Sequence, residues 1–139
     1  MKKTKPWNQA KIRSFIISAL RKAHWPVKYE AIRKAYVRDG INPATGRKCK
    51  LHRCQECGEL FPAKDMQADH IEPVIPLDCS WSQGENFLGY DWNQVVARLF
   101  CKLENYQALC KDCHKIKTSE ERKLRNQYKK EFKSNELLK

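Results

Sequence analysis

The chain has 139 residues, of which 41% are hydrophobic and 10% aromatic, and this suits one compact domain with a modest core and some tail. It carries 28 Lys+Arg against 16 Asp+Glu, a formal net charge of +12, which favours nucleic acid as the partner. No apolar run approaches the roughly 18 residues of a membrane span, and no secretory signal follows the basic start, so we expect a cytoplasmic protein with no membrane partner.

The charge is unevenly distributed along the chain. Residues 1–50 hold 14 Lys+Arg and two acids, residues 51–114 hold five and ten, and residues 115–139 hold nine and four. Two basic flanks therefore bracket an acidic middle. A solvated surface is the simple interpretation of any one charged run, but the whole pattern suits carboxylates that hold a cation between lysines that hold phosphates.

Apolar side chains recur at helical spacing near the N-terminus. They predict a helix over residues 7–23, ended by Pro26, and a second helix over roughly 27–38. The Gly, Pro and Asn content of DGINPATG (39–46) predicts a loop. We expect residues 1–48 to form a basic helical N-terminal arm that either docks on the core or lies on DNA.

The rest of the chain predicts α+β structure. Residues 50–75 read as short β-like pieces, and DWNQVVARLF (91–100) reads as a short helix with Asp91 as its N-cap. A helix rich in Lys, Glu and Arg is expected from Lys111 to about Tyr128, and residues 131–139 are expected to be a flexible C-terminal tail.

Two C-x2-C pairs, Cys54–Cys57 and Cys110–Cys113, carry the strongest chemical signal. Seven cysteines cannot all pair with one another, and in a reducing compartment cysteines are more often metal ligands or free thiols than disulfides. Each pair can place two thiolates on one ion from a tight turn, and two pairs complete a tetrahedral site. We therefore predict a structural zinc held by four thiolates. A redox dithiol is the rival, but the sequence lacks a thioredoxin-like βαβ pattern.

The remaining cysteines and two histidines are expected to have no metal. Cys49, Cys79 and Cys101 are then spare thiols, and His24 and His52 are structural or surface residues. His52 is a weaker substitute for one of the four cysteine ligands.

His114 directly follows Cys113, and adjacent helical residues diverge by about 100°. We expect His114 to face away from the zinc, toward Asp69 and His70 in MQADHIEPV. Neighbours in a regular strand point to opposite faces, but two prolines follow closely and favour an irregular strand end. An aspartate and one histidine can hold a divalent ion while a second histidine removes a proton from water.

These motifs together resemble the HNH endonucleases, specifically the zinc-containing group. The resemblance covers about residues 50–120 and rests on the upstream C-x2-C, DHIEPV, and LENYQALCKDCHKIKT with its C-x2-C-H-x2-K. The three signature positions would be His70, Asn105 and His114. The resemblance implies a ββα-metal fold (a His-Me finger), in which two short strands and a helix hold one catalytic ion, within a nuclease domain over residues 49–130.

The interval between the first two signature positions is longer than the family pattern. Asn86 and Asn93 also lie in this interval. Asn105 is preferred because it stands five residues before Cys110, in an N-x-x-x-L-C context.

The resemblance also implies roles for single residues. His70 would be the general base, and Asp69 and His114 would hold Mg²⁺ or Mn²⁺, with Ni²⁺ also compatible. Asn105 would brace the loop between the strands and orient the base. Lys117 would contact a phosphate, although a solvated helix charge explains it equally well.

The activity that this resemblance implies is metal-dependent hydrolysis of DNA phosphodiester bonds, by nicking or double-strand cleavage. Free-standing proteins similar to this family are often encoded by phages or mobile elements, which would place this one in the host cytoplasm. One such site cuts one strand, so a monomer and a homodimer are both compatible. The alternative is a non-catalytic zinc-knuckle regulator that binds nucleic acid, which explains the charge and the cysteines but not the aspartate and histidines.

Overall fold

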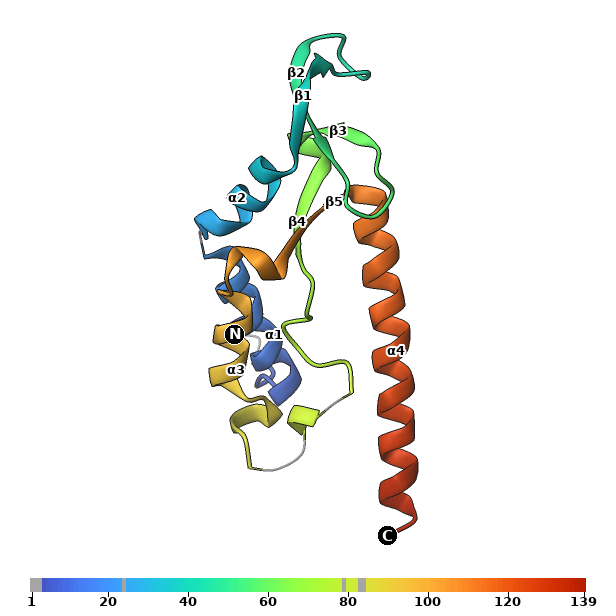
Figure 1. Cartoon of the computed structure of the whole chain (residues 1–139). Helices are drawn as coiled ribbons and strands as arrows, with labels where there is room; N and C mark the ends of the chain where they lie inside the picture. Colours follow the sequence, from blue (N-terminus) through green and yellow to red (C-terminus); the bar gives the residue numbers. More distant parts are fainter. Residues whose placement is uncertain (1–3, 24, 79, 83–84) are drawn as a thin grey trace.

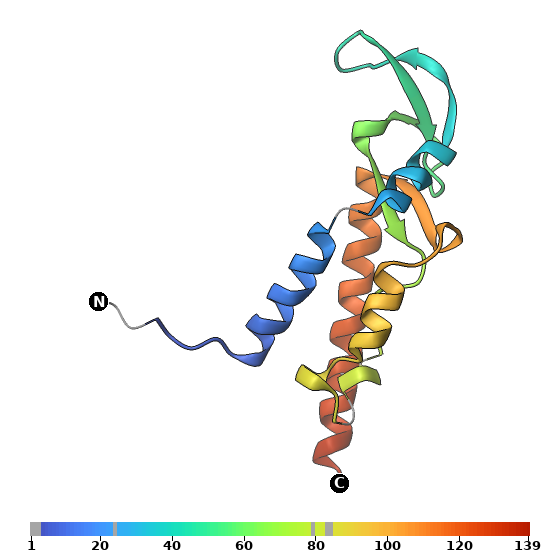
Figure 2. The same cartoon turned by 90° about the vertical axis from the view of Figure 1, so that its left-hand side faces the viewer.

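The computed structural model describes residues 4–23, 25–78, 80–82 and 85–139. Its secondary structure is α+β, as the sequence predicts. The long helix α4 stands beside the rest of the chain, and α1 lies to one side of α4 (Figures 1 and 2). The helices and strands follow the chain in the order α1 (Gln9–Lys22), α2 (Pro26–Lys34), β1 (Tyr36–Ile41), β2 (Lys48–Arg53), β3 (Leu60–Pro62), β4 (Met66–His70), α3 (Trp92–Leu99), β5 (Tyr106–Cys110) and α4 (Lys111–Leu137).

The strands form two small antiparallel sheets. One has the order β1-β2-β3, and the other pairs β4 with β5. In the second sheet Asp69 lies opposite Gln107 and His70 lies opposite Tyr106. Because α4 begins directly after β5, the chain makes a continuous β5–α4 unit that packs beside β4.

The first expected helix is confirmed, but the second is shorter than predicted. α2 ends at Lys34, and the next segment is strand β1, so the helix expected over 36–38 and the loop expected over 39–41 were wrong. Tyr36 and Val37 are aromatic and β-branched, types that suit a pleated strand, and pairing with β2 outweighs their helical spacing. Residue 48, the expected end of the N-terminal arm, is the first residue of β2, so the β1–β2 pairing joins the two sides of that boundary.

The two helices in the second half of the chain begin where the sequence predicts. Asp91 caps α3, because its Oδ1 accepts from the amide of Gln94 at 3.2 Å. α4 begins at Lys111 but runs through Leu137, so its expected end near Tyr128 was wrong, and the helix continues through most of residues 131–139. The chain from 111 to the end has no Gly or Pro and is rich in strong helix formers, so nothing in it stops the helix earlier.

Among the described residues, most of the buried apolar side chains gather in two clusters. One lies where α2 and β3 meet the β4–β5 sheet, and the other lies where α1 and α3 meet the segment after β4. The first cluster comprises Cys54, Met66, Ala108, Leu109 and Cys110. The second comprises Val74, Val95 and Leu99, with Ile17 and Leu20 of α1 packed against it. The first cluster therefore anchors the β4–β5 sheet and the start of α4 to α2, and the second holds α1 against α3 and the segment after β4.

Among the described residues, none of the helices combines the length and the apolar character that crossing a membrane requires.

Candidate functional site

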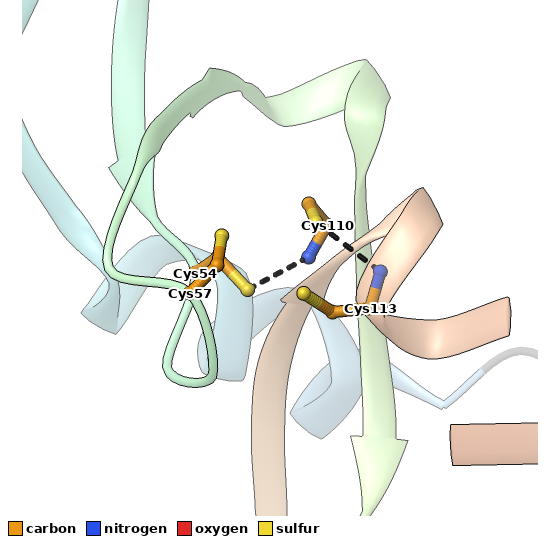
Figure 3. Close-up of side chains that lie close together, drawn as sticks. All are labelled: Cys54, Cys57, Cys110 and Cys113. Atoms are coloured by element: carbon orange, nitrogen blue, oxygen red, sulfur yellow. Dashed lines mark hydrogen bonds between the residues drawn. The ribbon is translucent and has the colours of Figure 1, made fainter. Parts of the chain in front are cut away.

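The four cysteines of the two C-x2-C pairs come together at the start of α4. Cys54 and Cys57 lie in the turn after β2, Cys110 is the last residue of β5, and Cys113 lies in the first turn of α4 (Figure 3). Their sulfur atoms all lie within 4.8 Å of one another. Gly58 supports the first turn, because its φ of 75° is a conformation that glycine adopts without steric cost.

Backbone amides point at these sulfur atoms. The amide of Cys110 donates to Cys54 Sγ at 3.3 Å, and the amide of Cys113 donates to Cys110 Sγ at 3.4 Å (Figure 3). Burial opposes ionisation of Cys54, but the amide hydrogen bonds outweigh it and lower the pKa of that thiol to about 7. The hydrogen bond with Cys110 and burial raise the pKa of Cys113 well above its usual value.

This arrangement is consistent with a zinc site. Four thiolates this close repel one another, and one soft divalent cation at their centre offsets that repulsion. Tetrahedral Zn²⁺ with Zn–S distances of about 2.3 Å places its sulfur ligands about 3.8 Å apart. The four sulfur atoms here, all within 4.8 Å of one another, are close enough to adopt that arrangement. Two of the ligands, Cys54 and Cys110, are buried, so the site is closed on the protein side. The predicted four-cysteine cluster is therefore confirmed as a group that can hold a metal.

The spare cysteines and histidines lie elsewhere in the structure. Cys49 and Cys101 are free thiols outside the four-cysteine cluster. His52 is buried in β2 and is not one of the cluster's ligands. Cys79 and His24 lie outside the described residues.

Asp69 and His114 face each other across the groove between β4 and α4. Asp69 Oδ1 lies 3.6 Å from His114 Nε2, and the two side chains are 16% and 32% exposed. Gln107, opposite Asp69 on β5, donates from Nε2 to Asp69 Oδ2 at 3.1 Å. Among the described residues, no third His, Cys, Asp or Glu lies close enough to Asp69 and His114 to form a metal-binding group like that of the cysteines. They form a pair of one carboxylate and one imidazole, the Asp69–His114 pair.

Lys117 is the cation that neutralises this carboxylate. Its Nζ lies 2.7 Å from Asp69 Oδ2 and 2.6 Å from Glu121 Oε1, and it donates to the carbonyl oxygen of His70 at 3.1 Å. Partial burial opposes its charge, but hydrogen bonds to the two carboxylates outweigh burial and raise the pKa of the ammonium. Lys117 is therefore a fixed charge at the site, half-buried against Asp69.

His70 is held by the end of α3. Its Nε2 lies 3.1 Å from the carbonyl oxygen of Leu99, and its ring centroid lies 4.6 Å from that of Tyr106. Because a carbonyl oxygen can only accept, Nε2 carries the hydrogen and the neutral ring keeps a lone pair on Nδ1. Burial lowers the pKa of His70, and this favours the neutral imidazole.

Asn105 is the asparagine that contacts the segment after His70. Its backbone carbonyl accepts from the amide of Ile71 at 2.9 Å, and its Oδ1 accepts from the amide of Glu72 at 3.3 Å. Asn86 and Asn93 lie elsewhere, before a 3₁₀ turn and in the first turn of α3. The structure thus places Asn105 as a brace between the end of β4 and the start of β5.

One cavity of about 620 Å³ is lined by Asp69, His70 and His114, together with Lys117 and Glu121. Although Asp69 and His70 are neighbours in a strand, both reach this cavity, because β4 ends at His70. Four arginines also line it, two from α1 and two from α4: Arg13, Arg21, Arg122 and Arg125. The cavity thereby combines two carboxylates, two imidazoles and a cationic wall.

Sequence reasoning missed three of the contacts that build this site. Glu121 follows Lys117 by four residues, a spacing at which helical side chains meet, so this pair was readable from the sequence. Gln107 and the Leu99 carbonyl were not readable, because the first depends on strand register and the second on where α3 packs.

No protein-family model matches this chain, and neither a curated protein nor a solved structure is significantly similar to it.

Proposed function

We propose that the chain is a metal-dependent HNH DNA endonuclease with a ββα-metal core formed by β4, β5 and α4. The observation that carries this proposal is the convergence of Asp69, His70 and His114 on one cationic cavity, directly beside the four-cysteine cluster. Asp69 and His70 lie at the end of β4, and His114 lies in the first turn of α4. These are the positions that the HNH motif requires. Arginines on the cavity wall suit a phosphate backbone.

His70 is the general base in this proposal. Its neutral ring offers Nδ1 to a water, while the hydrogen bond from Nε2 to Leu99 fixes the tautomer and the ring orientation. When the water attacks phosphorus, its proton passes to Nδ1, the bond to the 3′-oxygen breaks, and solvent protonates that oxygen. The products are a 5′-phosphate and a 3′-hydroxyl.

Asp69 and His114 are the side chains that would hold the catalytic ion. The fit rests on two facing donor atoms, Asp69 Oδ1 and His114 Nε2, at an open cavity, a set that suits Mg²⁺ or Mn²⁺ because these ions keep several waters. Ni²⁺ is also compatible with the imidazole. When bound, such an ion stabilises charge on the phosphoryl and leaving oxygens.

The neighbouring residues hold this arrangement in place. Asn105 ties the segment after His70 to the start of β5, and thereby positions the base without touching the ion. Lys117 forms an ion pair with Asp69 and stands in the same cavity, where its ammonium can also contact a phosphate oxygen. A structural zinc on the four cysteines would fix the first turn of α4 and hence the direction of His114.

Cleavage of supercoiled plasmid tests the proposal. Zinc-loaded protein without other divalent ions should leave the plasmid intact, and added Mg²⁺ or Mn²⁺ should start nicking. Adding metal is preferable to a chelator, which also strips thiolate sites. End mapping should find 5′-phosphate and 3′-hydroxyl termini.

His70→Ala is the decisive variant, and Gln67→Ala on the same strand is its matched control. Gln67 is exposed and does not line the cavity. His70→Ala should lose about 100-fold or more of the nicking rate, while zinc content and melting temperature persist. Normal nicking by His70→Ala would refute the assignment of the base. Binding of DNA by the wild-type protein with no cleavage in any metal would instead favour the zinc-knuckle regulator.

A further inference from the structure

The β1–β2 hairpin, residues 36–53, is a basic ribbon that the proposed active site does not use. It extends beyond the rest of the molecule, at the top of Figure 1, and none of its residues lines the cavity. In the described sheets β1 pairs only with β2, so it is an edge strand. The hairpin carries one acid, Asp39, against five basic residues, which are Arg38, Arg47, Lys48, Lys50 and Arg53.

The tip of this hairpin is internally ordered although it is exposed. Every residue from 43 to 48 is exposed, whereas Asn42 is buried. The amide of Asn42 donates to the carbonyl of Arg47 at 2.8 Å, and its own carbonyl accepts from Gly46 at 2.8 Å. Its side-chain Oδ1 accepts from the amide of Ala44 at 2.9 Å. An exposed tip that is already ordered loses little entropy when it binds.

The register of the two strands determines which side chains share a face of the ribbon. Residues that pair directly share a face, so Asp39, Ile41, Lys48 and Lys50 lie together on one side. Tyr36 joins them, since its hydroxyl donates to Asp39 Oδ1 at 3.1 Å and Lys50 Nζ lies 5.9 Å from its ring centroid. This face combines ammonium donors, a carboxylate acceptor and an exposed aliphatic side chain.

We propose that this hairpin enters the major groove of duplex DNA, an inference that rests on DNA as the proposed substrate. A major groove of B-DNA admits a two-stranded β-ribbon, and it presents guanine acceptors, cytosine donors and thymine methyl groups. Lys48 and Lys50 match the acceptors, Asp39 matches the cytosine amino group, and Ile41 matches the methyl group. Arg47 at the tip faces the flanking phosphates.

A duplex whose major groove is filled tests this placement. Binding is measured with the zinc-loaded full chain, without Mg²⁺ or Mn²⁺, on an ordinary duplex and on one whose cytosines are replaced by glucosylated 5-hydroxymethylcytosine. The two duplexes carry the same charge. The wild-type protein should bind the glucosylated duplex about ten-fold more weakly. Equal affinity would overturn the proposal, and so would equal affinity for double-stranded RNA, whose major groove is too narrow to enter.

Removing the charges of the hairpin identifies the element responsible. The variant Arg47→Gln/Lys48→Gln/Lys50→Gln should lose the preference for the unmodified duplex, and its salt dependence should fall by about two to three counterions. All three residues are exposed, so the fold should persist.

The matched control removes the same charge from exposed positions on α4, as Lys115→Gln/Lys123→Gln/Lys130→Gln. The control should keep the preference. If the hairpin variant keeps it, or the control loses it, the hairpin is not the element in the groove. None of these binding measurements requires cleavage, so they test the hairpin even if His70 proves not to be the general base.

Discussion

The four-cysteine cluster and the Asp69–His114 pair stand side by side, yet they are built in opposite ways. Cys113 and His114 are adjacent in one helical turn, but the first joins a cluster with two buried ligands and the second faces an open cavity. Around the cysteines, uncharged backbone amides donate to sulfur. Around Asp69 a lysine ammonium already balances the charge.

This contrast shows how one helix start can present two kinds of ligand. A closed set of four soft thiolates leaves no coordination position free, which suits a structural ion. Two hard or borderline donors at a cavity leave positions free for water and phosphate, which suits the catalytic ion that we propose. If the contrast holds, single substitutions should disable the two sites separately.

Cys113→Ser should cost the zinc and much of the fold. Removing one thiolate opens the closed site, and metal binding in such sites supplies folding free energy, so we expect a loss of at least about 3 kcal/mol. Zinc content by mass spectrometry and thermal unfolding measure both effects. Cys49→Ser is the matched control, because Cys49 is a free thiol outside the cluster. Full zinc content and an unchanged melting temperature in Cys113→Ser would contradict a structural zinc site.

His114→Ala, one residue further along the helix, should have the reverse effect. We expect the nicking rate to fall by about 100-fold or more, because the proposed ion loses its imidazole ligand, while zinc content is retained. Plasmid nicking over a range of Mn²⁺ concentrations measures the loss. The control is Lys115→Ala, whose side chain is exposed and lies outside the cavity. A loss of zinc in His114→Ala would show that His114 supports the zinc site, and would contradict the separation of the two sites.

Asp69→Asn and Asp65→Asn compare the stability that a half-buried ion pair and an exposed ion pair contribute. Asp69 accepts from Lys117 and Gln107 inside the cavity, so its neutralisation should cost about 1–2 kcal/mol of unfolding free energy. Asp65 lies 3.6 Å from Lys111 on the surface, and Asp65→Asn should cost less than about 1 kcal/mol. Urea unfolding of both variants measures the difference. Equal costs would show that the cavity does not strengthen the Asp69 contacts.

The fold was predictable from the sequence where local signals were undisputed. Apolar spacing located α1, and the Asp91 cap located α3. The prediction was wrong at residues 36–38, where the apolar periodicity suggested a helix but the segment pairs with β2 as a strand. It also failed at the end of α4, since a polar helical segment carries no stop signal until the chain ends.

The candidate site was predictable in its residue types but not in its supports. The motif selected Asp69, His70 and His114, and the structure brings all three to one cavity. The carbonyl that orients His70 belongs to Leu99, far along the chain, and no pattern of residue types marks a backbone carbonyl. The arginines of α1 reach the cavity only because α1 packs against the cluster around Val95.

Tyr106→Phe should have the smallest effect, and that effect should depend on pH. The Tyr106 hydroxyl donates to the Leu99 carbonyl at 2.9 Å, the same oxygen that His70 contacts, so its loss should cost about 1 kcal/mol at pH 7. Burial raises the pKa of Tyr106 to about 12, whereas an unfolded tyrosine has a pKa of about 10.

The sign of the pH effect follows from these two values. Between about pH 10 and pH 12 the unfolded tyrosine loses its proton and the folded one keeps it, so the wild-type protein loses stability as the pH rises. The phenylalanine variant lacks this loss, and the stability difference between the two proteins should therefore be complete below pH 10 and shrink above it. Urea unfolding at a series of pH values measures the difference. A constant difference would mean that Tyr106 ionises like an exposed tyrosine, and that the wall beside His70 is as open to water as the cavity itself.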